Sequence, residues 1–261
     1  MKNTYQKCVW CDGSVQNYEG PEDRLDWHRW RCRKCYSYGY IKNPNTAELS
    51  TIYQSAFNDS SSEGDFAIGS TSFDISNSLL NAVGWNKRNS KCLDYGGGKG
   101  YFAKALVNRG CNNITVYEPH GDNPNIKSVK WLNNIDSIQH ELFDWIFMIE
   151  VVEHMLDPEY ELKMIKEHLA PGGKLVITTP NAKGWRALKD GFKWREAQNA
   201  THINLFSTDA LIKCLQNAGY KKIKRVLRPV KYNVSGLKGL FLSVTQMIGI
   251  DGGIRLVVKK D

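Results

Sequence analysis

The sequence predicts an α/β protein built on a doubly wound, mostly parallel sheet of seven strands, preceded by a small cysteine-bearing module. Helix-like and strand-like patterns alternate from about residue 72 onward, as in parallel sheets that carry helices on both faces. The stretch FDWIFMIEVV at 143–152 is almost entirely apolar, which is typical of a central strand. The third observation is a glycine cluster at 96–100, because ligands of such sheets bind at the carboxyl ends of strands.

Length and composition narrow the class of protein. The chain has 261 residues, 41% of them hydrophobic, which is enough for one α/β domain and a small appendage. It contains no apolar run of the roughly 20 residues that a transmembrane helix needs, and its first residues lack the apolar core of a signal peptide. Its seven cysteines are therefore expected to be reduced thiols or metal ligands, and we expect a cytoplasmic protein.

The N-terminal segment carries two CxxC pairs, Cys8 with Cys11 and Cys32 with Cys35, separated by 20 residues. Two such pairs can close a tetrahedral site of four thiolates around zinc, whereas a redox CxxC usually occurs singly beside a βαβ unit. Four thiolates leave no open coordination position, so the metal would support folding rather than chemistry. We therefore predict a structural zinc ribbon over residues 1–42.

A helical linker or lid is expected at residues 43–71. It begins with a turn and a short helix at 43–57, where apolar residues recur at helical spacing, and continues with the polar stretch NDSSSEGD. The main domain follows at 72–261, where Asp157 and Ser207 are expected to cap helices. Its strands are expected at 91–95, 114–119, 129–132, 143–152, 174–180, 221–229 and 254–260, and its helices at 72–85, 100–110, 157–173 and 207–220.

The glycines follow the pattern Gly96-x-Gly98-x-Gly100, which excludes two common nucleotide loops. A phosphate loop requires Ser or Thr directly after its lysine, and here Gly100 follows Lys99. A dinucleotide loop requires its third glycine where this chain has Tyr101. The third glycine comes one residue early, and the tighter turn suits a ligand without a pyrophosphate.

Two carboxylates at strand ends complete the ligand pattern. Glu118 lies 20 residues beyond Gly98 and can accept hydrogen bonds from both hydroxyls of a ribose. Asp94, at the end of the preceding strand, can face an ammonium group. A ribose joined to a cationic amino-acid tail describes S-adenosylmethionine (SAM).

Four blocks in order, LDYGGGKG, VYEP, FDWIFMIEVVEHMLDP and LAPGGKLVITTPN, resemble the class I SAM-dependent methyltransferases. The resemblance covers about residues 72–261 and implies a Rossmann-like sheet. Alternatively, the glycines form only a tight turn that binds no ligand. The other three blocks of the resemblance argue against this interpretation. By this resemblance the SAM site comprises Asp94, Gly96, Gly98, Gly100, Glu118, Pro119 and, near the adenine, Asn133.

The segment IEVVEHMLDP is similar to the E-x-x-E-H segment of ubiquinone-pathway O-methyltransferases, with Glu150, Glu153 and His154 at the matching positions. An acceptor hydroxyl needs a base or a metal to help remove its proton, and His154 has a suitable intrinsic pKa. The three side chains can also hold a divalent ion. In the alternative interpretation, Glu153 caps a turn and His154 packs against the next helix.

The acceptor is expected to contact the segment after the fifth strand of the sheet. There His202 is a second catalytic candidate, and Trp185, Trp194 and Arg195 can form a wall that stacks on sugars or bases and binds phosphate. Alternatively, the tryptophans only cover the sheet. The layout of ribbon, linker, methyltransferase domain and this segment resembles methyltransferases of bacterial surface-polysaccharide gene clusters, which implies a small-molecule or glycan acceptor. Carbon-methylating relatives carry an additional C-terminal domain, so we favour O-methylation.

The net charge of +8 comes from one region, because residues 221–261 hold ten Lys or Arg and two Asp or Glu. This region suits an anionic acceptor, a membrane surface or RNA, or is only a solvated face.

An RNA methyltransferase is the first alternative function, although the ribbon is not strongly basic and no base-holding motif follows the fourth strand. Nothing in the sequence points to DNA. A non-enzymatic binding module is the second. The apolar stretch 234–250 can lie on a membrane or form a helix between the last two strands.

Overall fold

A computed structural model describes residues 6–19, 28–42, 48, 65–86, 89–230 and 236–260, with the backbone alone for 65–72. The short helix expected at 43–57 and the polar stretch after it lie almost wholly outside the described residues. The first described helix of the main domain, α2 (Asp65–Ala82), begins seven residues before the expected boundary at 72.

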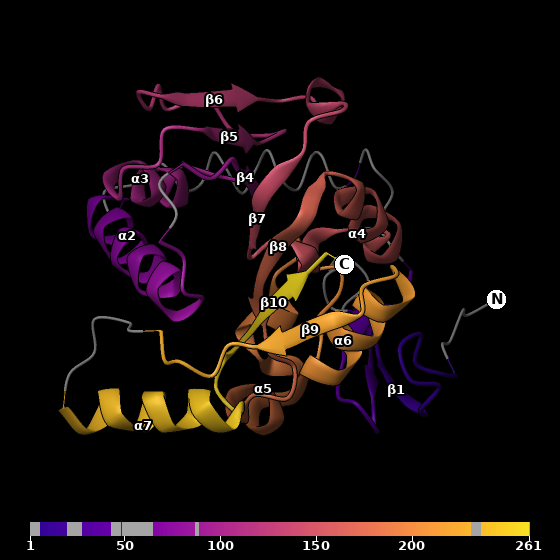
Figure 1. The fold of residues 1–261 in the computed structure, drawn as a ribbon. Coiled ribbons are helices and arrows are strands. Elements are labelled where there is room, and N and C mark those ends of the chain that lie inside the picture. The colour runs from indigo at the N-terminus through magenta and orange to yellow at the C-terminus, as the bar shows by residue number, and fades with distance from the viewer. Residues whose placement is uncertain are drawn as a thin grey trace.

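The main domain is a seven-stranded sheet, as predicted, with the strand order β6-β5-β4-β7-β8-β10-β9 (Figure 1). The first five strands in this order are parallel to one another, and β10 is antiparallel to both β8 and β9. The order reverses beside β4, where a ligand cleft is expected. The strands are β4 (Cys92–Tyr95), β5 (Ile114–Tyr117), β6 (Val129–Leu132), β7 (Phe143–Ile149), β8 (Leu169–Pro180), β9 (Lys222–Arg225) and β10 (Gly253–Lys259).

Helices cover both faces of the sheet. The helices α2 and α3 (Tyr101–Asn108) pack on one face through a core that includes Leu80 and Phe102, and α4 (Pro158–Glu167) and α6 (Thr208–Asn217) pack on the other. The side chain of Asp157 accepts a hydrogen bond from the Tyr160 amide at 3.0 Å and Ser207 caps α6 in the same way, as expected. None of the described helices combines the length and apolarity that crossing a membrane requires.

Two elements differ from expectation. Strand β7 ends at Ile149 because Glu150 has a φ of +56°, and a 3-10 turn, η3 (Val152–His154), follows. Strand β8 begins at Leu169, so the Pro-Gly-Gly sequence that was expected to end a helix lies within an irregular strand. Chain segments after the strands also form the unpredicted elements η2 (Ile135–Ile138), α5 (Trp185–Asp190), η4 (Gly191–Lys193) and η5 (Arg195–Gln198).

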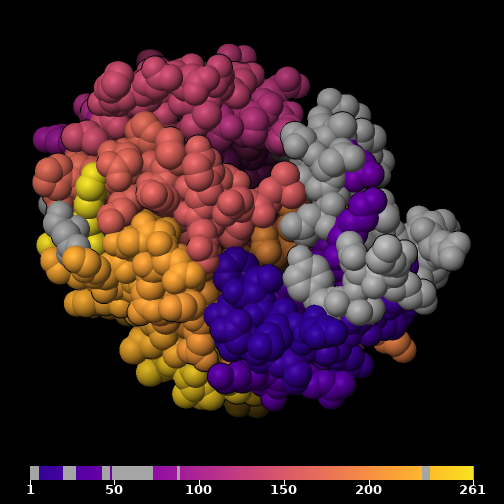
Figure 2. All heavy atoms as spheres, turned by 90° about the vertical axis from the view of Figure 1, so that its right-hand side faces the viewer, coloured from indigo at the N-terminus to yellow at the C-terminus, as the bar shows by residue number. Residues whose placement is uncertain are grey.

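The described residues 6–19 and 28–42 form a separate antiparallel sheet, β1 (Val15–Tyr18), β2 (Arg29–Cys32) and β3 (Tyr38–Tyr40), which we call the cysteine module. Figure 2 shows it in indigo, directly against the orange part of the main domain. Its buried cysteines and Trp30 belong to the same apolar core as Leu211 of α6. The module is therefore packed against the main domain.

Candidate cofactor and acceptor site

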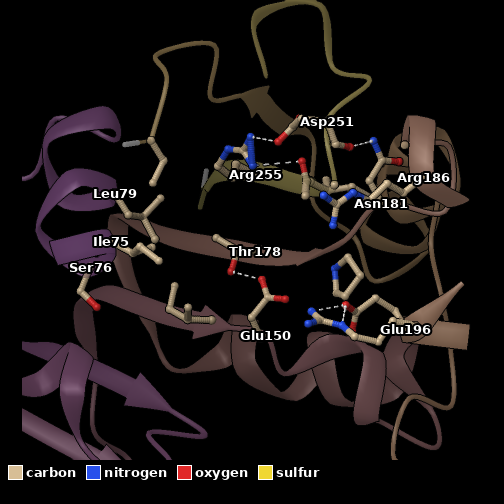
Figure 3. A pocket seen from close by; sticks show the side chains of 18 of the residues that line it. Ile75, Ser76, Leu79, Glu150, Thr178, Asn181, Arg186, Glu196, Asp251 and Arg255 are labelled. Atoms are coloured by element: carbon tan, nitrogen blue, oxygen red, sulfur yellow. Dashed lines mark hydrogen bonds and ion pairs between the residues drawn. The ribbon is translucent and has the colours of Figure 1, made fainter. Parts of the chain in front are cut away.

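A cavity of about 900 Å³ opens at the carboxyl ends of β4, β7 and β8. One end is formed by α2 and the glycine loop after β4, and the other by α5, η5 and the start of β10. Figure 3 shows Ile75 and Leu79 of α2 on one side of the cavity and Arg186 on the other. Ligands of doubly wound sheets bind at this edge. The residues that line the cavity include Asp94, Gly96, Gly98, Glu150, Thr178, Asn181, Trp185, Arg186, Trp194, Arg195, Glu196, Asp251 and Arg255.

The glycine loop brings the backbone close to the cavity. Gly98 has a φ of +53°, and a Cβ atom added there would meet no heavy atom within 4 Å, so its backbone faces open space. Gly96 combines a φ of +75° with tight packing, because its Cβ would lie 2.6 Å from Val151. Gly100 is not among the lining residues; it precedes α3, and its Cβ would meet Ile126. Two of the three glycines thus face the ligand space, and the third lies at the start of a helix.

Asp94 is a buried carboxylate with an unsatisfied oxygen in the cavity wall. It is 1% exposed, and no described residue donates a hydrogen bond to its Oδ2. Burial, opposed by the hydrogen bond from the Ala103 amide and assisted by the nearby Glu118 charge, raises the pKa of Asp94 to about 7. A cationic group in the cavity would stabilise the ionised carboxylate. The position therefore fits the ammonium group of SAM.

Glu118 is tied to the glycine loop. Its Oε2 accepts a hydrogen bond from the Gly98 amide at 2.8 Å, and its Oε1 accepts from the amides of His120 and Gly121 at 2.9 and 3.2 Å. A carboxylate has about four acceptor positions, so three amides leave room for one further donor. Glu118 thus shapes the loop and does not belong to the described cavity lining, and its remaining acceptor position serves one of the two ribose hydroxyls of the prediction. Pro119 and Asn133 are exposed, and neither belongs to the described cavity lining.

Glu150 points into the cavity from the end of β7, with the Thr178 hydroxyl beside it (Figure 3). The Thr178 Oγ1 donates to Glu150 Oε1 at 2.7 Å. The left-handed backbone of Glu150 is unusual for a residue with a side chain, and such strain often occurs at functional sites. Glu150 is exposed to the open cavity, and desolvation by the surrounding cavity wall raises the pKa of its carboxyl, opposed by the Thr178 hydrogen bond. This carboxylate is placed to accept a hydrogen bond from a bound acceptor.

Glu153, His154 and His202 form a second, buried group, and their ligand atoms lie within 4.8 Å of one another. Glu153 Oε2 accepts from the Thr179 hydroxyl at 2.8 Å, while no described residue donates to its Oε1. Burial, followed by the Glu150 charge, holds the pKa of Glu153 well above its usual range. The structure therefore separates Glu150, which faces the cavity, from Glu153 and His154, although the three are close in sequence.

Burial favours the neutral form of both histidines of this group, and the tautomer of His154 follows from its partner. His154 Nδ1 lies 2.9 Å from the Thr201 carbonyl, which can only accept, so Nδ1 carries the proton and Nε2 the lone pair. Burial lowers the pKa of His154. Burial, the neighbouring His154 and Arg29 lower the pKa of His202 to about 3. The two rings meet edge to face at 4.8 Å, and neither histidine belongs to the described cavity lining.

The acceptor end of the cavity contains the predicted wall and further residues that the sequence did not indicate. Trp185, Trp194 and Arg195 line it, as does Arg186, which was not among the predicted residues. Arg255 of β10 is also present; it is buried and forms an ion pair with Asp251. Its signal in the sequence was a cation placed between apolar residues at the start of the strand IRLVVKK. Asn181, next to them, donates to the carbonyls of Gly249 and Asp251 at 3.2 and 3.1 Å.

The four N-terminal cysteines converge as the CxxC spacing predicted. The Sγ atoms of Cys8 and Cys35 lie 3.6 Å apart and those of Cys11 and Cys32 3.5 Å apart, with all four within 4.8 Å of one another. A tetrahedral zinc with Zn–S bonds of about 2.3 Å places its sulfurs about 3.8 Å apart. Backbone amides of Trp10, Lys34 and Cys35 point at two of these sulfurs, as they do around thiolates. The arrangement fits a structural zinc ion.

Residues 73–225 match the protein family described as "Methyltransferase domain". The chain belongs to this methyltransferase family. The cofactor of such SAM-dependent enzymes fits the glycine loop and the unsatisfied Asp94 carboxylate of the methyltransferase described here.

Relatives of this methyltransferase differ in what they act on. It is 28% identical over 153 residues to the tRNA U34 carboxymethyltransferase of Alteromonas mediterranea, covering 51% of this chain and 46% of that protein. It is 27% identical over 166 residues to the ubiquinone biosynthesis O-methyltransferase of Cereibacter sphaeroides, covering 56% of this chain and 67% of that protein. The matched part thus spans less than half of the first relative and about two thirds of the second.

A similar fold occurs in a SAM-dependent methyltransferase of Thermotoga maritima, described as a possible histamine N-methyltransferase. The two structures align with a TM-score of 0.56 at 18% sequence identity, covering 82% of this chain and all of the other. At this identity the likeness establishes the Rossmann-like fold and leaves the acceptor open.

Proposed function

We propose that this methyltransferase transfers a methyl group from SAM to a hydroxyl oxygen of a sugar or sugar-linked acceptor used in surface-polysaccharide biosynthesis. One observation carries the proposal: a single cavity of about 900 Å³ joins the glycine loop to an acceptor wall of tryptophan and arginine side chains around Glu150. A cavity of this size accommodates a nucleoside-sized cofactor together with a small acceptor. Aromatic faces stack on sugar rings, and carboxylates accept hydrogen bonds from their hydroxyls.

The chain's own residues divide the work between the two ends of the cavity. SAM would supply the methyl group when bound, and the backbone at Gly96 and Gly98 and the Asp94 carboxylate would hold it. We propose that Glu150 accepts the proton of the acceptor hydroxyl, because it lines the cavity and Thr178 fixes its orientation at 2.7 Å. A base with a raised pKa is better matched to this task than an ordinary carboxylate. His154 remains a predicted base, and His202 a predicted catalytic residue.

We propose two metal sites with different roles. Zinc at the four cysteines would hold the cysteine module together, and such a thiolate site is stable in a reducing compartment such as the cytoplasm. The divalent ion expected at Glu150, Glu153 and His154 is better supported with His202 in place of Glu150, because the described residues bring these three ligand atoms together. A carboxylate and two imidazoles are a common set of ligands for transition metals. Unchanged activity after chelation of divalent ions would exclude this second site.

An RNA acceptor is the second candidate function. Two observations favour it: the similarity to a tRNA-modifying enzyme and the exposed cations Lys221, Lys222, Lys224 and Arg225 in and beside β9. Phosphate binding by such cations is strongly salt-dependent. The cavity favours the sugar, because its described lining has more carboxylates than cations, among them Glu150, Glu196 and Asp251.

Methyl transfer from radiolabelled SAM distinguishes the two functions. The purified enzyme is incubated with a nucleotide-sugar and polysaccharide fraction and, separately, with total RNA. A Glu150→Gln variant, which keeps the size of the side chain, serves as the matched control. We expect Glu150-dependent label in the sugar fraction. Label confined to RNA would overturn the proposed acceptor and would favour the basic strand β9 as the site of acceptor binding.

A further inference from the structure

Helix α7 (Gly236–Ile248) turns its apolar side to solvent. The exposed positions recur every three or four residues and so lie on one face of the helix, which is the pattern normally found on the buried face. In Figure 1 this helix runs along the edge of the molecule, with its C-terminal end beside α5. The exposed side chains, which we call the apolar stripe, are 47% to 86% exposed and comprise Leu237, Leu240, Phe241, Val244, Met247 and Ile248.

The opposite side of α7 is polar and anchors the helix to the protein. Gln246 is buried, and its amide accepts a hydrogen bond from the Val230 nitrogen at 2.7 Å and donates one to the Val230 carbonyl at 2.9 Å. Thr245 is also buried and donates to the Leu242 carbonyl within the helix. Turning the stripe inward would break both bonds to Val230 and bury polar groups without partners. The helix expected between the last two strands therefore forms, with its apolar stripe directed outward.

Cations and a second apolar surface surround the stripe. The Trp185 ring of α5 meets Phe241 edge to face at 6.5 Å, and Leu188 of α5 is also exposed. Exposed Lys238 lies on α7, and α5 carries the exposed cations Arg186 and Lys189 and one exposed carboxylate, Asp190. The chain region that contains α7, residues 221–261, has ten Lys or Arg against two Asp or Glu. An apolar stripe bordered by cations is complementary to a surface with acyl chains below anionic headgroups.

We propose that α7 and the exposed side chains of α5 lie on an anionic membrane surface and bring the cavity to a lipid-linked acceptor. Helix α7 has 13 residues, about 20 Å in length, which suits lying in the interface rather than crossing a bilayer. The cavity adjoins this surface, because Leu242 of α7 and Trp185 and Arg186 of α5 line it. The lipid-linked nature of the acceptor rests on the proposed function, whereas attachment to the membrane does not.

Vesicle flotation of the full-length protein, without acceptor or SAM, tests the attachment. The vesicles contain phosphatidylcholine alone or phosphatidylcholine with phosphatidylglycerol. The test variant is Leu237→Glu/Leu240→Glu, and the matched control is Met164→Glu, which changes an exposed apolar residue of α4. We expect the wild-type protein and the control to float with anionic vesicles, and the bound fraction of the test variant to fall about tenfold. Thermal unfolding confirms that each variant is folded.

Three outcomes would overturn the proposal. In the first, the wild-type protein does not float with anionic vesicles. In the second, the test variant floats as well as the control. In the third, no protein binds vesicles and the substitutions of the test variant convert a dimer into a monomer. The last result would assign the stripe to a second copy of the chain. Because the vesicles carry no acceptor, a wrong sugar assignment leaves this result unchanged, and failed flotation leaves the methyl-transfer assay unchanged.

Discussion

The main chains of Tyr38 and Leu205 pair through two hydrogen bonds of 2.8 and 3.0 Å, joining the last strand of the cysteine module to the segment before α6. The Arg29 guanidinium also donates to the Asn199 carbonyl at 2.9 Å, and the Tyr40 hydroxyl to that of Ala200 at 2.8 Å. The buried Tyr38 ring packs against Trp194, a residue of the acceptor wall. The module therefore supports the acceptor end of the cavity.

Loss of the four-cysteine site should consequently impair methyl transfer more than cofactor binding. We expect Cys32→Ser to lower the free energy of unfolding by about 4 kcal/mol or more, the range of a lost metal site. SAM affinity, measured by calorimetry on the folded fraction, should change by less than about fivefold, or about 1 kcal/mol. Lys34→Ser, an exposed change in the same module, is the control. Equal loss of SAM binding and methyl transfer would show that the module does not act through the acceptor wall alone.

Replacing Glu150 should slow the reaction and change its pH profile. Glu150→Gln retains an oxygen for the Thr178 hydroxyl but cannot take a proton, so we expect kcat to fall about 10²-fold with SAM affinity unchanged. In the wild-type enzyme a base with a raised pKa must be deprotonated to act. The wild-type rate should thus rise with pH through that pKa, and the rise should disappear in the variant. A Glu150→Gln enzyme with wild-type kcat would remove Glu150 from proton transfer.

His154 tests the alternative base. Its Nε2 carries the lone pair because Nδ1 donates to Thr201, so the tautomer suits proton abstraction. If His154 is the base, His154→Ala should reduce kcat about 10²-fold or more. His154→Gln, whose side-chain amide can still donate to Thr201, separates the packing role from the chemical one. Turnover that returns in the Gln variant would assign His154 to packing.

The buried Asp94 carboxylate should lower the free energy of unfolding of the SAM-free protein at high pH. Its pKa is raised to about 7 in the folded state, so between its ordinary pKa and that value the folded protein binds a proton that the unfolded chain does not. Stability therefore falls as the pH rises through this window. We expect Asp94→Asn to stabilise the SAM-free protein by about 2 kcal/mol at pH 8 and by little at pH 4, while SAM affinity drops at pH 8.

Urea unfolding at the two pH values, with and without SAM, measures this difference. Asp144→Asn, at an exposed carboxylate of β7 outside the cavity lining, is the matched control. Destabilisation of Asp94→Asn by the same amount at both pH values would contradict the assignment, because it would indicate a lost structural contact instead of a relieved buried charge.

The features that the sequence predicted well depend on neighbours in the chain. The Asp157 cap contacts an amide three residues away, and the turn at Gly98 requires a positive φ that favours glycine. The alternation of apolar stretches likewise indicated the strands, because burial on both faces demands it. The two CxxC pairs, which begin at Cys8 and Cys32, have the spacing of a metal site, and this spacing predicted that the four cysteines lie together.

By itself, the sequence determined the seven-stranded class, the glycine loop and the cysteine site, since each depends on short-range geometry or a known spacing. Only the tertiary structure decided that Glu150 enters the cavity while Glu153 turns inward to Thr179. It also brought Arg255 to the acceptor end and turned the apolar stripe of α7 outward. The physical reason is that the direction of a side chain depends on the packing and hydrogen bonds of segments far apart in the chain, which local patterns do not encode.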